Sequence, residues 1–303
     1  MRARLGGMQR SAGVLVPPAG EAARARDELR ALRAGPCFLL VAAPFEALAR
    51  GLGLLEPGGL ELLLAEASGP QGRARTAVIP LEGRSERLHL RPVRHGGALA
   101  GLWGDRLLGL RRPSAELRTN ARLRARGAPV PRPVLVAGQR RSGPFWRAAV
   151  ATLHEENAVD GVAFLAGAPQ PERLLRACTA VGSAVRVLHD AGGRHRDLHV
   201  KNVLVREAGS ETQALLIDLD RARLVPELDA RARMAEIMRL YRSLVKRGLL
   251  AVVGHEGCQA FLSAYTAGDH SLGSALLAHL PRERRRLALH RLGHRLSGAA
   301  QRR

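Results

Sequence analysis

The chain has 303 residues, of which 46% are hydrophobic, and a formal net charge of +21 at pH 7. Its length and apolar content suffice for one large domain or two lobes with a sizeable core. A chain this basic attracts anions, so nucleic acid, anionic lipid and anionic glycolipid are admissible partners and a polycationic substrate is disfavoured. Only two of the 48 basic residues are lysines, Lys201 and Lys246, so part of the charge is what a GC-rich genome produces by codon bias.

The three cysteines, Cys37, Cys178 and Cys258, are widely spaced. They show neither metal-ligand spacing nor a disulfide framework, which favours a reducing compartment. The basic N-terminus is not followed by a clean apolar region with a cleavage site. No stretch reaches the roughly 20 uninterrupted apolar residues that a membrane-spanning helix requires. We therefore expect a protein that is soluble or peripheral to a membrane.

Residues 1–65 are rich in alanine, arginine, leucine and glycine, and we expect them to form an N-terminal extension of unknown role. A helix is predicted around residues 21–33. The apolar run 37–41 fits either a strand or a buried helix, because short apolar runs do not separate the two.

Residues 66–155 have the pattern of a small strand-rich lobe. Turn residues over 68–73 open it, and Gly-Ala-Pro-Val-Pro at 127–131 ends a helix within it. The predicted elements are strands at 76–80, 88–93, 134–136 and 147–153 and a helix at 114–126.

Residues 156–303 are predicted to form a larger helical lobe. Apolar residues recur at steps of three and four between 171 and 190, which predicts a helix that stops at Gly192-Gly193. A short hairpin, 203–205 with 215–217, is expected to interrupt the helices. This order of a strand-rich and a helical lobe predicts an α+β, two-lobed, protein-kinase-like fold.

The C-terminal run from Pro281 to Arg303 carries leucines between arginines at the spacing of a basic amphipathic helix. We interpret it as a packed helix with a solvated basic face, and a helix on a membrane surface is the alternative.

The loop from His195 to Asn202 reads H-x-D-x-x-x-x-N and is followed by an apolar strand that ends in Asp218. Phosphoryl transfer from ATP uses these groups together. Asp197 is predicted to be the catalytic carboxylate that orients the acceptor hydroxyl. Asn202 and Asp218 are predicted to bind Mg²⁺ through the hard oxygen atoms that this ion prefers. His195 is expected to brace the loop, and Asp220 to be a structural carboxylate, with metal contact as the alternative.

The predicted nucleotide-binding residues depart from the usual kinase pattern, because no lysine precedes position 201. Arg91 is the candidate for holding the phosphates, since a guanidinium can clamp phosphate oxygens bidentately. Glu116, at the start of the next helix, is its predicted ion-pair partner. The alternative is that Arg91 is one more arginine on a solvated face. The loop with Gly69 and Gly72 is predicted to cover the phosphates, because glycine permits close backbone approach.

Several stretches resemble the lipopolysaccharide kinase family, in particular the 3-deoxy-D-manno-octulosonic acid (Kdo) kinases. They are Leu90 to Gly97, Glu116 with Gly127 to Pro133, Asp197 to Asn202, Ile217 to Asp220, and Arg239 to Lys246. Together they cover roughly residues 69–247. The first and the last of these stretches are more specific to the family than the catalytic loop.

The resemblance implies a protein-kinase-like enzyme that is peripheral on the cytoplasmic face of the inner membrane. It would use ATP and Mg²⁺ to phosphorylate a sugar hydroxyl, of Kdo or another inner-core sugar, on a lipopolysaccharide precursor such as Kdo-lipid A. The family's arginine on the same strand supports Arg91. A cationic chain suits this anionic lipid, and nucleic acid is not expected. The unusual residues 153–156 and the aliphatic Leu219 after Asp218 leave the exact acceptor open.

Two other functions stay open on the sequence alone. A small-molecule phosphotransferase of the aminoglycoside or choline kinase type shares a similar loop, although the charge of +21 disagrees with a polycationic substrate. A catalytically degraded kinase-like binding protein fits the missing lysine, but Asp197, Asn202 and Asp218 are all intact. A protein kinase is disfavoured because no Ala-Pro-Glu-like segment follows Asp218.

Overall fold

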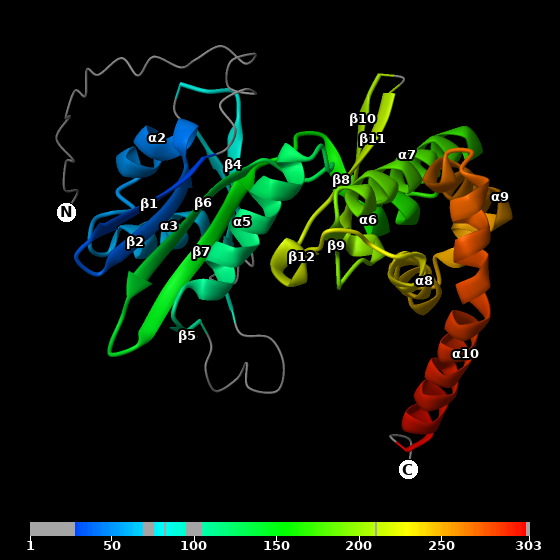
Figure 1. Ribbon diagram of the computed structural model, residues 1–303. Helices are drawn as coiled ribbons and strands as arrows, with labels where there is room; N and C mark the ends of the chain where they lie inside the picture. The colour runs from blue at the N-terminus through cyan, green and yellow to red at the C-terminus, as the bar shows by residue number, and fades with distance from the viewer. Residues whose placement is uncertain (1–27, 69–75, 82, 95–104, 210, 301–303) are drawn as a thin grey trace.

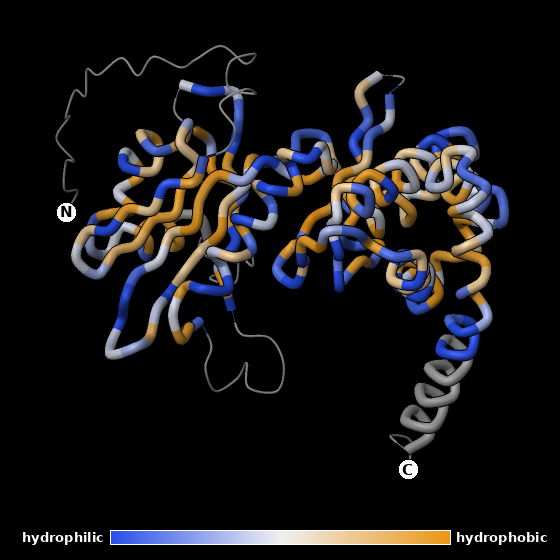
Figure 2. Tube along the Cα trace, in the orientation of Figure 1, coloured by the Kyte–Doolittle hydropathy of each residue, from blue (hydrophilic) through white to orange (hydrophobic). Residues whose placement is uncertain are grey.

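The structure is a computed structural model that describes residues 28–68, 76–81, 83–94, 105–209 and 211–300. A strand-rich lobe is followed along the chain by a helical lobe (Figure 1). The predicted α+β, two-lobed order is therefore confirmed. The strands of the first lobe are apolar over much of their length, whereas hydrophilic residues lie in the loops and along the helices (Figure 2).

The first lobe is built on an antiparallel sheet of seven strands in the order β1-β2-β6-β7-β4-β3, with β5 paired to β7. Its strands are β1 (Leu29–Ala34), β2 (Cys37–Ala42), β3 (Ala77–Pro80), β4 (Arg87–Pro92), β5 (Leu107–Leu108), β6 (Pro133–Arg140) and β7 (Phe145–Leu153). The four predicted strands of this lobe correspond to β3, β4, β6 and β7.

The described part of the N-terminal segment contributes two strands to this sheet. The helix predicted over 21–33 is wrong for Leu29 to Arg33, which form β1 and pair with β2; residues 21–27 lie outside the described residues. The run 37–41 is a strand whose residues are all buried, and it pairs with β6. Strands from before and after position 65 belong to this one sheet. The described part of the expected extension is therefore part of the first lobe.

Helices cover both faces of the sheet. Alternate residues of β2 point to opposite faces. Leu39 and Val41 pack against residues of two helices on one face, and Phe38 and Leu40 pack against a third helix on the other face. These helices are α2 (Glu46–Gly51), which follows the 3₁₀ turn η1 (Ala43–Phe45), α3 (Gly59–Ser68) and α5 (Arg111–Ala125). In Figure 1, α5 lies on the side of the sheet that faces the second lobe. The predicted helix 114–126 is confirmed as α5, with an earlier start.

The second lobe packs around the long helix α7 (Pro171–Asp190), which confirms the predicted helix. The helix α9 (Leu250–Thr266) crosses α7 at Gly182, where a Cβ atom would lie only 2.3 Å from the carbonyl oxygen of Phe261. The remaining elements are β8 (Ala158–Asp160), α6 (Gly161–Ala166), β9 (Gly193–Arg194), η2 (Val200–Asn202), β10 (Val203–Ala208), β11 (Glu211–Leu216), η3 (Leu219–Arg221), β12 (Arg223–Leu224), α8 (Ala230–Lys246), α9 (Leu250–Thr266) and α10 (His270–Ala300). The predicted hairpin is β10 with β11.

The C-terminal helix α10 begins at His270 and contains Pro281, so it does not begin at the proline as predicted. Its first turns pack on α8, where the buried Glu283 pairs with Arg242 and Arg286. The predicted amphipathic pattern beyond Arg286 lies outside the side chains that the structure describes. No helix in the described part of the chain is long and apolar enough to cross a membrane.

Candidate active site

The candidate catalytic loop leaves α7 through a turn that requires glycine. Gly192 has φ of +77°, and a Cβ atom there would lie 2.1 Å from the carbonyl oxygen of Val225. A backbone with positive φ is favourable for glycine and strained for other residues. The chain therefore turns at the glycine that was predicted to end this helix, and it enters the loop that begins at His195.

Backbone and side-chain hydrogen bonds hold this loop in place. The buried His195 donates from Nε2 to the carbonyl oxygen of Ile217 at 2.9 Å, so its predicted bracing contact is present. Asn202 donates from Nδ2 to the carbonyl oxygen of Asp197 at 3.0 Å, and its own carbonyl accepts from the Ile217 amide at 2.9 Å. These bonds bring Asp197, Asn202 and the residue after Ile217, Asp218, to one place.

The carboxylate of Asp197 is accessible, with 41% of its side chain exposed, and lies 3.9 Å from Nε2 of His199. Burial lowers the pKa of His199 and outweighs the opposite effect of Asp197. His199 is therefore neutral at neutral pH and does not form a charged pair that would occupy Asp197. An acceptor hydroxyl can thus reach this carboxylate.

Asp218 has a left-handed backbone, with φ of 61° and ψ of 63°. Non-glycine residues seldom adopt this conformation, and surrounding contacts must hold it. Its side chain is exposed and makes no hydrogen bond or ion pair with the part of the chain that the structure describes. Leu219, which follows, is only 3% exposed and anchors the turn in the core.

The donor atoms at this site fit Mg²⁺. The Asn202 amide nitrogen is bound to the Asp197 carbonyl, which leaves its oxygen for a ligand, and the Asp218 carboxylate makes no hydrogen bond or ion pair within the described residues. Both are hard oxygen donors. In the described residues no group of three or more His, Cys, Asp or Glu side chains is placed to hold a metal. Among the described residues, Asn202 and Asp218 are the side chains that would hold a Mg²⁺ ion, which would supply positive charge beside the phosphates.

Asp220 differs from Asp218, because its carboxylate is already paired. It accepts from Nε of Arg112 at 2.6 Å and from Nη2 of the same guanidinium. Burial opposes the charged form, but the hydrogen bond from Arg112 outweighs it and lowers the pKa of Asp220. The geometry agrees with a structural carboxylate rather than with metal contact.

The predicted ion pair between Arg91 on β4 and Glu116 on α5 is present, with Nη2 to Oε1 at 2.5 Å. Their side chains are 29% and 9% exposed, so the interpretation of Arg91 as a solvated arginine is wrong. Burial alone would lower the pKa of Arg91, but the Glu116 carboxylate outweighs burial and raises it. Asp218 and Asp220 raise the pKa further. Arg91 thus remains a cation near enough to Asp218 and Asp220 for its charge to interact with theirs, and its binding of phosphate stays a prediction.

Two of the predicted nucleotide-binding residues, Gly69 and Gly72, lie outside the described residues.

A buried polar network below the loop was not predicted from the sequence. Glu236 on α8 accepts from the His195 backbone amide at 2.9 Å and lies 3.3 Å from Nε2 of His189. Nδ1 of His189 lies 2.7 Å from the Tyr265 hydroxyl. Burial lowers the pKa of His189 and raises that of Tyr265 to about 12, so both side chains are neutral. The sequence feature that could have indicated this network is Glu236 itself, a lone carboxylate between Met234 and Ile237 on an apolar helix face.

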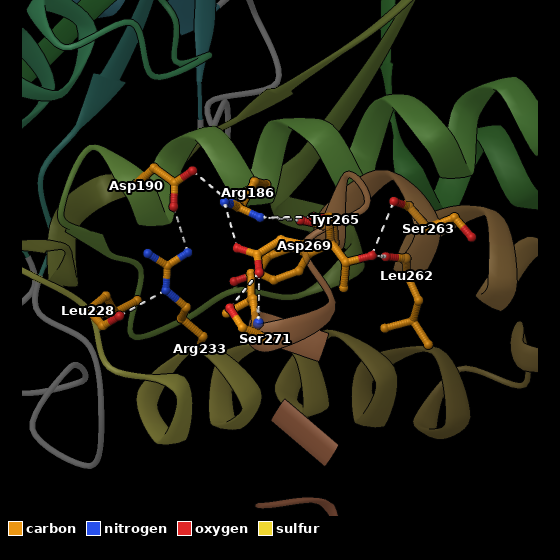
Figure 3. Close-up of polar contacts among 11 residues, drawn as sticks. Arg186, Asp190, Leu228, Arg233, Leu262, Ser263, Tyr265, Asp269 and Ser271 are labelled. Atoms are coloured by element: carbon orange, nitrogen blue, oxygen red, sulfur yellow. Dashed lines mark hydrogen bonds and ion pairs between the residues drawn. The ribbon is translucent and has the colours of Figure 1, made fainter. Parts of the chain in front are cut away.

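A second unpredicted network fixes the end of α7 just before the loop (Figure 3). Asp190 accepts from Nε of Arg186 at 2.6 Å and from Nη1 of Arg233 at 2.7 Å. Arg233 also donates to the carbonyl oxygen of Leu228 at 2.8 Å, and Arg186 to that of Tyr265 at 3.1 Å. These contacts tie α7, α8 and α9 together at the point where the catalytic loop begins.

Comparison with known proteins agrees with this geometry. The model of the lipopolysaccharide kinase (Kdo/WaaP) family matches residues 70–265. The chain is 31% identical to the 3-deoxy-D-manno-octulosonic acid kinase of Mannheimia succiniciproducens over 154 residues, which cover 48% of this chain and 62% of that protein. It is 35% identical to the enzyme of the same name from Actinobacillus succinogenes over 130 residues, which cover 40% of this chain and 52% of that protein.

These matches span about half to three fifths of the length of both relatives. The solved structure of WaaP in complex with acyl carrier protein superimposes with a TM-score of 0.50 at 21% identity and covers 82% of this chain and 98% of that one. At this identity the likeness concerns the fold, which is that of a kinase. The family match covers most of the chain, including every described residue of the candidate site, and the chain belongs to the lipopolysaccharide kinase (Kdo/WaaP) family.

Proposed function

We propose that the chain is an ATP- and Mg²⁺-dependent kinase that phosphorylates a sugar hydroxyl, of Kdo or another inner-core sugar, on a lipopolysaccharide precursor. The observation that carries this proposal is the convergence of Asp197, Asn202 and Asp218 at one loop, with the paired Arg91 of the other lobe near enough for its charge to interact with Asp218. Membership of the family and relatives named as 3-deoxy-D-manno-octulosonic acid kinases support it.

Each residue of the candidate site has its own role in the proposed reaction. Asp197 accepts a hydrogen bond from the sugar hydroxyl and takes its proton as the oxygen attacks the γ-phosphorus of ATP. The bond from the γ-phosphorus to the bridging oxygen breaks, and ADP leaves. Asn202 and Asp218 hold Mg²⁺, which when bound neutralises charge on the phosphate oxygens. Arg91, oriented by Glu116, binds phosphate oxygens through its planar guanidinium.

The charge of the chain supports an anionic acceptor. A net charge of +21 attracts a phosphorylated, Kdo-bearing lipid such as Kdo-lipid A and the anionic surface in which it lies. We propose that the protein acts as a peripheral protein on the cytoplasmic face of the inner membrane. Nucleic acid is not part of this proposal, because the proposed acceptor is a sugar hydroxyl of a glycolipid.

A transfer assay tests the proposed function. Purified protein is incubated with labelled ATP and Mg²⁺ and with Kdo-lipid A, an aminoglycoside or a generic protein as acceptor. We expect label on the glycolipid, and a loss of about 10²- to 10⁴-fold in Asp197→Asn, the range for a general base. The control is Asp269→Asn, at the exposed N-terminus of α10, where asparagine can replace the capping carboxylate.

The outcomes separate the alternatives. Label on the aminoglycoside alone would instead identify a small-molecule phosphotransferase. Nucleotide binding without transfer to any acceptor would identify a degraded kinase-like binding protein. Equal activity in Asp197→Asn and the control would refute the assigned catalytic role.

A further inference from the structure

The helix α5 contacts the second lobe at both of its ends. Near its start, Arg112 pairs bidentately with Asp220 in η3, and at its end Arg126 donates to the carbonyl oxygen of Ala191 at 2.9 Å. Glu116 lies four residues after Arg112, one turn along the same side of the helix. The residue that orients Arg91 is thus carried by a helix whose ends are both tied to the other lobe.

The partner of Arg112 stands two residues after the predicted metal ligand Asp218. The intervening residue, Leu219, is buried, so η3 is fixed on one side by the core and on the other by the guanidinium. Asp218 itself has the left-handed backbone that must be maintained by its surroundings. Without Arg112, the described contacts that hold the turn would reduce to the packing of Leu219 and to local backbone bonds.

The arrangement of charges gives Arg112 a second effect. Arg91 is paired with Glu116, and Arg112 with Asp220. Asp218 is left as the carboxylate of this group that makes no ion pair within the described residues. If Asp220 lost its partner, two free carboxylates would stand two residues apart and would compete for the same cations. Arg112 therefore keeps one carboxylate structural and leaves the other for a metal.

We propose that Arg112 is a positioning residue that links the two lobes and fixes Asp218 for Mg²⁺ in the nucleotide complex. This inference rests on the proposed function, because it concerns the same site. It assigns Arg112 no contact with the substrate. Its effect passes through Asp220 to the metal ligand and through α5 to Glu116.

The test measures nucleotide binding instead of turnover. The affinity for a fluorescent ATP analogue is titrated in excess Mg²⁺ and in EDTA, and the ratio of the two gives the Mg²⁺ enhancement. We expect Arg112→Ala to reduce this enhancement by about 10- to 100-fold, the range for loss of a partner that orients a metal ligand. A role in folding alone would change the melting temperature without changing the ratio.

A matched control comes from another bidentate pair of similar exposure. Arg173 on α7 binds Glu207 on β10, with Nε to Oε1 at 2.8 Å, within the second lobe. Arg173→Ala should leave the Mg²⁺ enhancement unchanged, and Arg112→Lys, which retains the charge, should recover most of it. If Arg112→Ala does not fold, Asp220→Asn removes the same ion pair with nearly the same side-chain volume and should give the same loss.

The two failures are distinguishable. If the unmodified protein binds the nucleotide with a clear Mg²⁺ enhancement and Arg112→Ala or Asp220→Asn retains it to the same extent as Arg173→Ala, the positioning role is refuted and the proposed function stands. If the unmodified protein does not bind the nucleotide under either condition, the proposed function fails and the role of Arg112 fails with it.

Discussion

Glu236 offers a strong test of how the second lobe holds the catalytic loop. Its side chain is 6% exposed, and Oε2 accepts from the His195 amide at 2.9 Å and lies 3.3 Å from Nε2 of His189. Replacement by alanine removes the acceptor for two buried donors at once. The His195 amide belongs to the backbone of the loop that carries Asp197, so we predict that the loss affects both stability and activity.

The magnitude follows from the two donors. A buried hydrogen-bonding group left without a partner costs about 1–3 kcal/mol, so Glu236→Ala should lower the free energy of unfolding by about 2–6 kcal/mol. That is a large part of the total of about 5–15 kcal/mol typical of a folded domain. Glu236→Gln keeps an oxygen acceptor for the His195 amide, and we expect it to cost only about 1 kcal/mol.

Urea denaturation and transfer assays together provide the measurement, with Glu283→Ala as the matched control. Glu283 is also a buried carboxylate, 4% exposed, but it lies on α10 and pairs with Arg242 and Arg286, and none of its described contacts is with the catalytic loop. Both alanine variants should lose stability, whereas only Glu236→Ala should also lose turnover per folded molecule. The reasoning is refuted if the two variants have equal turnover, or if glutamine at 236 destabilises as much as alanine.

Two further predictions concern packing and pH. Gly182→Ala should lower the melting temperature because its Cβ would lie 2.3 Å from the Phe261 carbonyl oxygen, whereas Gly51→Ala, with open space around its Cβ, should not. Burial lowers the pKa of His189 below 6.5, so the unfolded chain binds a proton first and the free energy of unfolding should fall below about pH 6.5. His189→Gln should reduce that slope by up to about 1.4 kcal/mol per pH unit in urea denaturation, and the exposed His255→Gln should retain it.

Features set by nearby residues were predictable from the sequence. The spacing from His195 to Asn202 is short enough for the loop's own hydrogen bonds to fix its shape. The place of Asp218 could be predicted because it comes directly after the apolar strand that returns to this loop. The Arg91–Glu116 pair could also be predicted from the sequence, because a strand and the next helix bring their residues together in this fold.

Features set by distant partners were not predictable. Leu29 to Arg33 have a helix-favouring composition, yet they form β1 because pairing with β2 satisfies their backbone and outweighs local preference. Nothing near Arg112 in the sequence distinguishes it from the other arginines, because its partner Asp220 is 108 residues away. The same applies to Glu236, whose contact with His195 spans 41 residues.

These misses share a physical cause in the charge balance of the chain. With 48 basic and 27 acidic residues, the chain has too few carboxylates to give every arginine a partner of its own, and an arginine by itself therefore carries little information. Carboxylates are the limiting partners, and a buried one must be paired or hydrogen-bonded to be tolerated. Glu116, Asp220 and Glu236 each bind a segment that borders the candidate site. In a chain as basic as this one, the positions of the few acidic residues indicate which of the many cations have a defined role.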